Sequence, residues 1–137
     1  MPTAIAKPRR EFRNIHVTQI VGYRLPVPAL VSILHRISGA LLFFFGLPFL
    51  LYLFQQSLTS EISFDSYRET VSHPVAKLAL LVFLWAYLHH LIAGVRHLVM
   101  DLHYGLEKHS TKQSATVVMV LALSLTVVLG LKLFGVY

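Results

Sequence analysis

The chain has 137 residues, of which 55% are hydrophobic and 13% are charged, with 12 Lys and Arg, 6 Asp and Glu and 8 His. This hydrophobicity excludes a disordered chain, and charged residues are about half as frequent as in soluble domains, too few to coat a soluble surface. The absence of cysteine excludes disulfides, thiolate metal sites and covalent haem attachment.

Residues 1–27 form a polar and basic arm that precedes the first apolar segment. Prolines interrupt this arm, so we predict no long helix before Pro28. Its five cations are Lys7, Arg9, Arg10, Arg13 and Arg24.

Three apolar segments follow, and each is longer than the roughly 20 residues that a helix needs to cross about 30 Å of hydrocarbon. We predict helices at about 28–55, 74–103 and 113–136, so that residues 28–137 form a three-helix transmembrane anchor. Backbone groups in lipid must bond within their own segment, which favours helix even where Val, Phe and Thr are frequent. The sequence therefore predicts an all-α membrane protein, with a kink in the first helix at Pro48.

The charges of the connectors predict the orientation. The loop of about 56–73 carries Arg68 beside three acidic residues, whereas the link of about 104–114 carries Lys108 and Lys112. Lys and Arg are enriched in cytoplasmic segments, so we expect a cytoplasmic N-terminus and a C-terminus on the opposite, periplasmic side. Orientation and attraction to anionic lipid account for the basic arm, so no nucleic-acid partner is predicted.

The first predicted helix opens with the polar residues Ser32, His35, Arg36 and Ser38. Ser32 and Arg36 are four residues apart and share a helix face close to the cytoplasmic end. Arg36 could simply extend to the interface while Ser32 bonds to its own helix. Alternatively, the two side chains donate hydrogen bonds to a ligand carbonyl or carboxylate.

The second predicted helix carries a polar stripe that consists of His90, Gly94, His97 and Asp101, with His89 about 100° away around the helix. His90 falls near the middle of the hydrocarbon, and His97 lies about 10 Å nearer the cytoplasm. Gly94 permits either close helix packing or room for a flat macrocycle beside an imidazole ligand.

A lone histidine in a membrane more often bonds a neighbouring helix than a metal. Here, however, cationic groups at Arg36, Arg96 and His97 lie on the cytoplasmic side of His90. A haem b would place its iron at His90 and its propionates toward these cations. No other histidine shares the depth and face of His90, so the second axial ligand is expected from a partner subunit.

Both motifs resemble those of the cytochrome b556 subunits of bacterial succinate dehydrogenase. The pattern Ser-x-x-His-Arg-x-(Ser/Thr) of that family occurs at 32–38, and His-x-x-x-Gly-x-Arg-His-x-x-x-Asp occurs at 90–101. His103 stands where that family usually has a small residue.

This resemblance implies roles for five residues. His90 would be the axial ligand of haem b, and Ser32 and Arg36 would line a ubiquinone pocket. His35, Arg36 and His97 would contact the haem propionates.

The resemblance also implies an anchor of succinate dehydrogenase (respiratory complex II), which serves the tricarboxylic acid cycle and electron transport in the bacterial inner membrane. In such a complex a flavoprotein oxidises succinate, an iron–sulfur subunit passes electrons to ubiquinone, and a second membrane anchor completes the helical bundle. This chain has no flavin, nucleotide or cluster motif, so no catalytic residue and no independent activity are expected of it alone.

Two other interpretations stay open. The chain could anchor a fumarate reductase or another quinone-linked complex, because the polar site would be nearly the same. It could also be a haem-free structural anchor or a small protein that carries divalent metal through its histidines. Four histidines lie clearly within the predicted helices, and no carboxylate accompanies them at mid-depth: His35, His89, His90 and His97.

Overall fold

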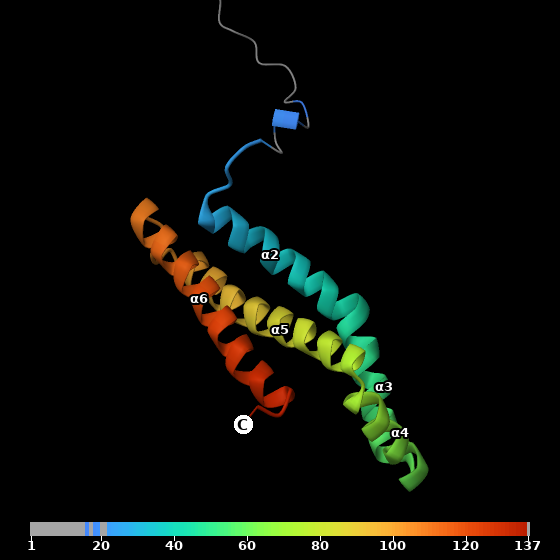
Figure 1. Cartoon of the computed structure of the whole chain (residues 1–137). Coiled ribbons are helices and arrows are strands. Elements are labelled where there is room, and N and C mark those ends of the chain that lie inside the picture. Colours follow the sequence, from blue (N-terminus) through green and yellow to red (C-terminus); the bar gives the residue numbers. More distant parts are fainter. Residues whose placement is uncertain (1–15, 17, 20–21, 137) are drawn as a thin grey trace, which may run out of the picture.

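The computed structural model describes residues 16, 18–19 and 22–136, and the regular elements among them are helical (Figure 1). In chain order they are α2 (Val27–Leu41), the π-helix η1 (Leu42–Gly46), α3 (Leu47–Thr59), α4 (Glu61–Ser72), α5 (Pro74–Asp101) and α6 (Lys108–Leu133). α2, α5 and α6 pack against one another, whereas α3 leads to α4 at the far end of the bundle. The predicted all-α fold is confirmed for the described residues.

Three continuous stretches are long and apolar enough to cross a membrane: Val27–Thr59, Pro74–Asp101 and Lys108–Leu133. The chain is therefore a multi-pass membrane protein. Small residues let its helices approach closely, because a short side chain keeps the backbones near each other. On α6 the buried positions recur every three or four residues and are mostly small: Ala115, Val118, Ala122, Thr126 and Gly130.

The first span changes its winding just before Pro48. A proline lacks the backbone N–H, and its ring clashes with the carbonyl four residues earlier, which here belongs to Phe44. The π turn at Leu42–Gly46 contains that carbonyl and relieves the clash by widening the helix. The ribbon bends where α2 passes into α3 (Figure 1), so the kink predicted at Pro48 lies in the turn that precedes it.

The loop predicted for about 56–73 is wrong, because Glu61–Ser72 forms the helix α4. Its start is fixed by a capping box in which the Ser63 N–H donates to Ser60 Oγ at 3.1 Å and the Ser60 N–H donates to Ser63 Oγ at 2.8 Å. Glu61 in the first turn adds a favourable interaction with the helix dipole. These local signals outweigh the polar composition that suggested a loop.

The link between the second and third spans is shorter than predicted. α5 ends at Asp101 rather than 103, and α6 begins at Lys108 rather than 113. The chain reverses within a few residues because His103 and Gly105 both take left-handed backbone conformations, with φ of 65° and 69°. This conformation disfavours most side chains, so His103 is an uncommon residue at such a position.

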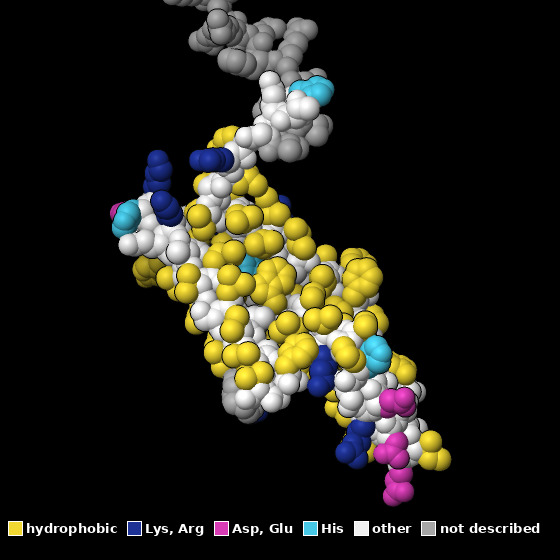
Figure 2. Space-filling view, in the orientation of Figure 1, with side chains coloured by type: hydrophobic (Ala, Val, Ile, Leu, Met, Phe, Trp, Pro, Cys, Tyr) yellow, Lys and Arg dark blue, Asp and Glu magenta, His cyan; other side chains and the backbone are white. Residues whose placement is uncertain are grey.

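Charge is distributed unevenly between the two ends of the bundle (Figure 2). The end at which residues 22–26 enter carries Arg24, Arg36, Arg96, Lys108 and Lys112 against Asp101 and Glu107. The opposite end balances three cations against three acids: Arg68, Lys77, Lys132, Glu61, Asp65 and Glu69. The remaining cations of the predicted arm, at 7, 9, 10 and 13, lie outside the described residues.

Candidate functional site

The imidazole of His90 reaches from α5 to the backbone of α2. Its Nδ1 lies 2.9 Å from the carbonyl oxygen of His35 and 3.4 Å from Ser38 Oγ. A backbone carbonyl can only accept, so this contact requires a proton on Nδ1, and the neutral form of the ring then has its lone pair on Nε2. Within the described part of the chain, Nε2 has no hydrogen-bond partner. A neutral imidazole held in this way has the form of a metal ligand.

Gly39 makes room for the His90 ring. A Cβ at this position would lie 2.7 Å from Cε1 of His90, closer than real Cβ contacts come. Gly94, in contrast, faces His35, since its Cβ would lie 3.4 Å from His35 Nε2. Of the two roles considered for Gly94, this contact favours close packing of α5 against α2, and Gly39 is the glycine that lies against the His90 ring.

Three imidazoles form a row between α2 and α5. The His35 ring stacks on His90 with a centroid distance of 4.1 Å and an interplanar angle of 7°. The His97 ring lies 5.1 Å from His35 at an angle of 55°. The structure thus brings together the predicted ligand and two of the predicted propionate residues. All three rings are partly exposed, so they remain accessible from outside this chain.

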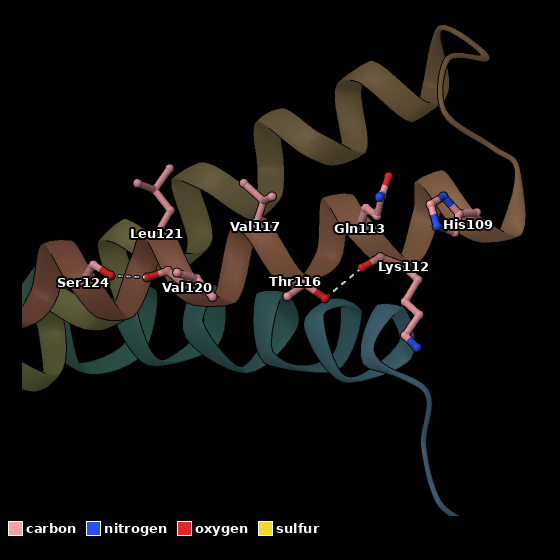
Figure 3. Close-up of a pocket in the computed structure, with 8 residues that line it drawn as sticks. All are labelled: His109, Lys112, Gln113, Thr116, Val117, Val120, Leu121 and Ser124. Atoms are coloured by element: carbon pink, nitrogen blue, oxygen red, sulfur yellow. Dashed lines mark hydrogen bonds between the residues drawn. The ribbon is translucent and has the colours of Figure 1, made fainter.

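Ser32 and Arg36 lie on α2 with their polar groups unpaired. Ser32 is half-buried and Arg36 is exposed, and neither side chain forms a hydrogen bond with a described residue. Other hydroxyls of the spans bond to backbone carbonyls of their own helix, as Figure 3 shows for two residues of α6. Thr116 Oγ1 donates to the Lys112 carbonyl oxygen at 3.0 Å, and Ser124 Oγ donates to the Val120 carbonyl oxygen at 2.8 Å. The Ser32 hydroxyl is therefore available to a ligand.

Arg96 does not join the cationic group that was expected beside the haem. Its side chain is 8% exposed and turns toward α6. Its Nε donates to Ser114 Oγ at 2.9 Å, and a terminal nitrogen donates to the Thr111 carbonyl at 3.2 Å. Position 96 lies about 100° around the helix from position 97. This rotation directs Arg96 toward α6, whereas His97 lies near His35 on α2.

His89 is buried completely, unlike its neighbour His90. Its ring stacks on Trp85 with a centroid distance of 5.5 Å, and neither ring nitrogen has a hydrogen-bond partner among the described residues. His89 therefore fills space between the helices and does not take part in the row of imidazoles.

Sequence reasoning assigned no role to Ser38 or Gly39, although both contact His90. A small polar residue followed by glycine at 38–39 could have indicated a close contact on α2. Assigning that contact to His90 requires knowing which turn of α2 faces residue 90.

The site offers imidazole nitrogens but not a complete metal-binding set. Among the described residues, no group of three or more His, Cys, Asp or Glu could hold a metal ion. A partly exposed single imidazole fits a metal that brings other ligands with it, as the iron of a haem does, with a further ligand from a second chain.

These features define a class: a multi-pass helical membrane protein with a row of partly exposed imidazoles between its first two spans. The family model described as "Succinate dehydrogenase/Fumarate reductase transmembrane subunit" matches residues 14–129. The chain belongs to this family.

Individual relatives agree with this assignment. The chain is 36% identical over 118 residues to a succinate dehydrogenase cytochrome b556 subunit of Coxiella burnetii, covering 85% of this chain and 91% of the relative. A protein of the same name from Paracoccus denitrificans is 34% identical over 93 residues, covering 68% of this chain and 71% of the relative. Another from Rickettsia prowazekii is 28% identical over 127 residues, covering 91% and 98%. The resemblance seen in the two motifs is thereby confirmed.

Proposed function

We propose that this chain is a membrane anchor of succinate dehydrogenase that provides one axial ligand of haem b and part of a ubiquinone-reduction site. The observation that carries the proposal is the His90 imidazole, whose Nδ1 is bonded to the His35 carbonyl while Nε2 keeps its lone pair. The relatives named cytochrome b556 subunits support a haem in this family.

In this proposal His90 binds the haem iron, and a second membrane-anchor subunit supplies the other axial ligand. The haem, when bound, adds a one-electron carrier within the membrane. His35, Arg36 and His97 hold the propionates, and the closeness of the His35 ring to both His90 and His97 supports a shared binding region. The partial exposure of these rings supports a site completed by another chain.

Ser32 and Arg36 bind ubiquinone near the basic end of the bundle. Reduction of a quinone builds negative charge on its oxygens, and a hydroxyl and a guanidinium stabilise that charge by donating hydrogen bonds. The unpaired Ser32 hydroxyl and the exposed Arg36 support this role, because neither group is committed to the chain itself. Their position within the first three turns of α2 gives protons access from the aqueous side.

The basic end faces the cytoplasm, where the iron–sulfur subunit docks and connects the anchor to the flavoprotein. The excess of cations at this end supports a cytoplasmic N-terminus and a periplasmic C-terminus in the bacterial inner membrane. In this arrangement the chain has no activity of its own and serves the complex by anchoring it and by forming the quinone site.

A fumarate reductase anchor is the alternative, since the family description includes both enzymes. The names of the three relatives favour succinate dehydrogenase. The two enzymes are distinguished by measuring, in the same membranes, the rate of succinate oxidation by quinone and the rate of fumarate reduction by quinol. A faster succinate oxidation supports succinate dehydrogenase, and a faster fumarate reduction supports fumarate reductase.

The ligand is tested by His90→Ala in the assembled complex, with His109→Ala at the exposed start of α6 as a matched control. We expect the low-spin b-type absorption to be lost in His90→Ala and kept in the control. An unchanged low-spin spectrum in His90→Ala would refute the ligand assignment.

The quinone site is tested by Arg36→Leu, with Arg68→Leu on α4 as the control. Succinate-dependent reduction of a ubiquinone analogue should fall about tenfold or more in Arg36→Leu, because the loss of a charged hydrogen-bond donor costs roughly 2 kcal/mol. Electron transfer to a soluble dye that bypasses the membrane should persist. Normal quinone reduction in Arg36→Leu would contradict the assignment of Arg36 to the quinone site.

A further inference from the structure

Ser38 shares a hydrogen-bond acceptor with His90. The Ser38 side chain is completely buried, and its Oγ donates to the His35 carbonyl at 2.9 Å. The Nδ1–H of His90 donates to the same oxygen, also at 2.9 Å. Ser38 is therefore in direct competition with His90 for one oxygen.

That oxygen has a third donor. His35 lies inside α2, where each carbonyl accepts the backbone N–H four residues later, here that of Gly39. A carbonyl oxygen has two lone pairs, so three donors are more than it can bind at full strength. Each donor weakens the bonds of the other two.

The hydroxyl acts mainly as a donor in this cluster. Its oxygen is 3.4 Å from His90 Nδ1, which is long for a hydrogen bond, whereas its contact with the carbonyl is 2.9 Å. Other hydroxyls in the spans bond to their own helix in the same manner, but the carbonyls used by Thr116 and Ser124 receive no second side chain among the described residues (Figure 3). Ser38 is distinguished by the imidazole that uses its acceptor.

We propose that Ser38 is a positioning residue that raises the midpoint potential of the haem iron by weakening the bond between His90 and the His35 carbonyl. This inference rests on the proposed function, in which His90 is the axial ligand. A strong bond from Nδ1–H to a carbonyl increases the electron donation of Nε2, which favours oxidised iron. By occupying part of the acceptor, Ser38 reduces that donation and favours reduced iron.

The test is a redox titration of the b-type absorption in membranes that contain the whole complex. The midpoint potential should be lower in Ser38→Ala than in the wild type. At the potential where the wild-type haem is half reduced, less than half of the haem in Ser38→Ala should therefore be reduced. Ser38→Cys should lie between the two, because a thiol is a weaker donor than a hydroxyl. Ser124→Ala, which removes a hydroxyl bonded only to its own helix, should titrate like the wild type.

A potential in Ser38→Ala that is unchanged or higher would overturn the proposal, since a higher value would mean that the hydroxyl mainly accepts from His90. The spectrum of His90→Ala is recorded in the same membranes. If it keeps the wild-type low-spin absorption, the proposed ligand itself fails. If it loses that absorption while Ser38→Ala titrates like the wild type, only the role of Ser38 fails.

Discussion

Two neighbouring stripes of α5 use similar residues for different purposes. The inner stripe consists of Ala86, His89, Ala93 and Arg96, all of which are buried. The outer stripe consists of His90, Gly94 and His97, all of which are partly exposed. The inner stripe has one histidine and the outer stripe has two, so the residue type alone does not distinguish the stripes.

The difference lies in what surrounds each stripe. In the inner stripe, Arg96 donates hydrogen bonds to α6, and the His89 ring stacks on Trp85. The outer stripe has one nitrogen bonded to α2 and another left open. The proposed ligand role of His90 depends on this combination of one bonded ring nitrogen and one without a partner among the described residues.

The largest effect is expected from Gly39→Ala, which tests whether α2 organises the outer stripe. The new Cβ would lie 2.7 Å from Cε1 of His90, so the ring must shift and its hydrogen bond to the His35 carbonyl is expected to be disturbed. We expect loss of the b-type absorption. Gly46→Ala is the control, because its Cβ would meet the side chains of Leu42 and Phe83 at 3.4 Å. A normal spectrum in Gly39→Ala would show that haem binding does not depend on the close approach of Gly39 to the His90 ring.

A smaller effect, on stability rather than on the spectrum, is expected from Arg96→Met. The substitution removes both bonds to α6 and leaves the Thr111 carbonyl without this donor. The complex should lose about 2–3 kcal/mol of stability, because hydrogen bonds of charged groups contribute roughly 1.5–3 kcal/mol. Thermal unfolding in detergent measures this loss, with Arg68→Met as the exposed control. An altered haem spectrum with normal stability would instead assign Arg96 to the outer stripe.

The smallest effect is expected from His89→Leu. The substitution replaces a buried imidazole, which lacks a hydrogen-bond partner among the described residues, by an apolar side chain of similar size. Stability should stay the same or rise by about 1 kcal/mol, since an unsatisfied buried polar group costs roughly 1–3 kcal/mol. The haem spectrum should not change, whereas His90→Leu in the same assay should lose it. Loss of haem in His89→Leu would end the distinction between the two stripes.

The sequence was sufficient to predict the three spans and the polar motifs, because apolar length and helical spacing are local properties. Ser32 and Arg36, for example, share a face by their spacing alone. The roles of Gly39 and Arg96 depend instead on which turns of α2 and α6 meet α5, and these contacts join residues far apart in the chain. The helix α4 was missed although its capping box is local, because its acidic composition was given more weight.

The π turn at Leu42–Gly46 has a consequence for the whole first span. Such a turn accommodates one more residue than an α-helical turn, which rotates everything beyond it by about 100°. Beyond this turn, α3 meets the Phe83 ring through Phe49 at a centroid distance of 5.8 Å, on a side offset from the one that an unbroken α-helix would present. The two halves of this membrane crossing therefore present different faces to α5 than one uninterrupted α-helix would.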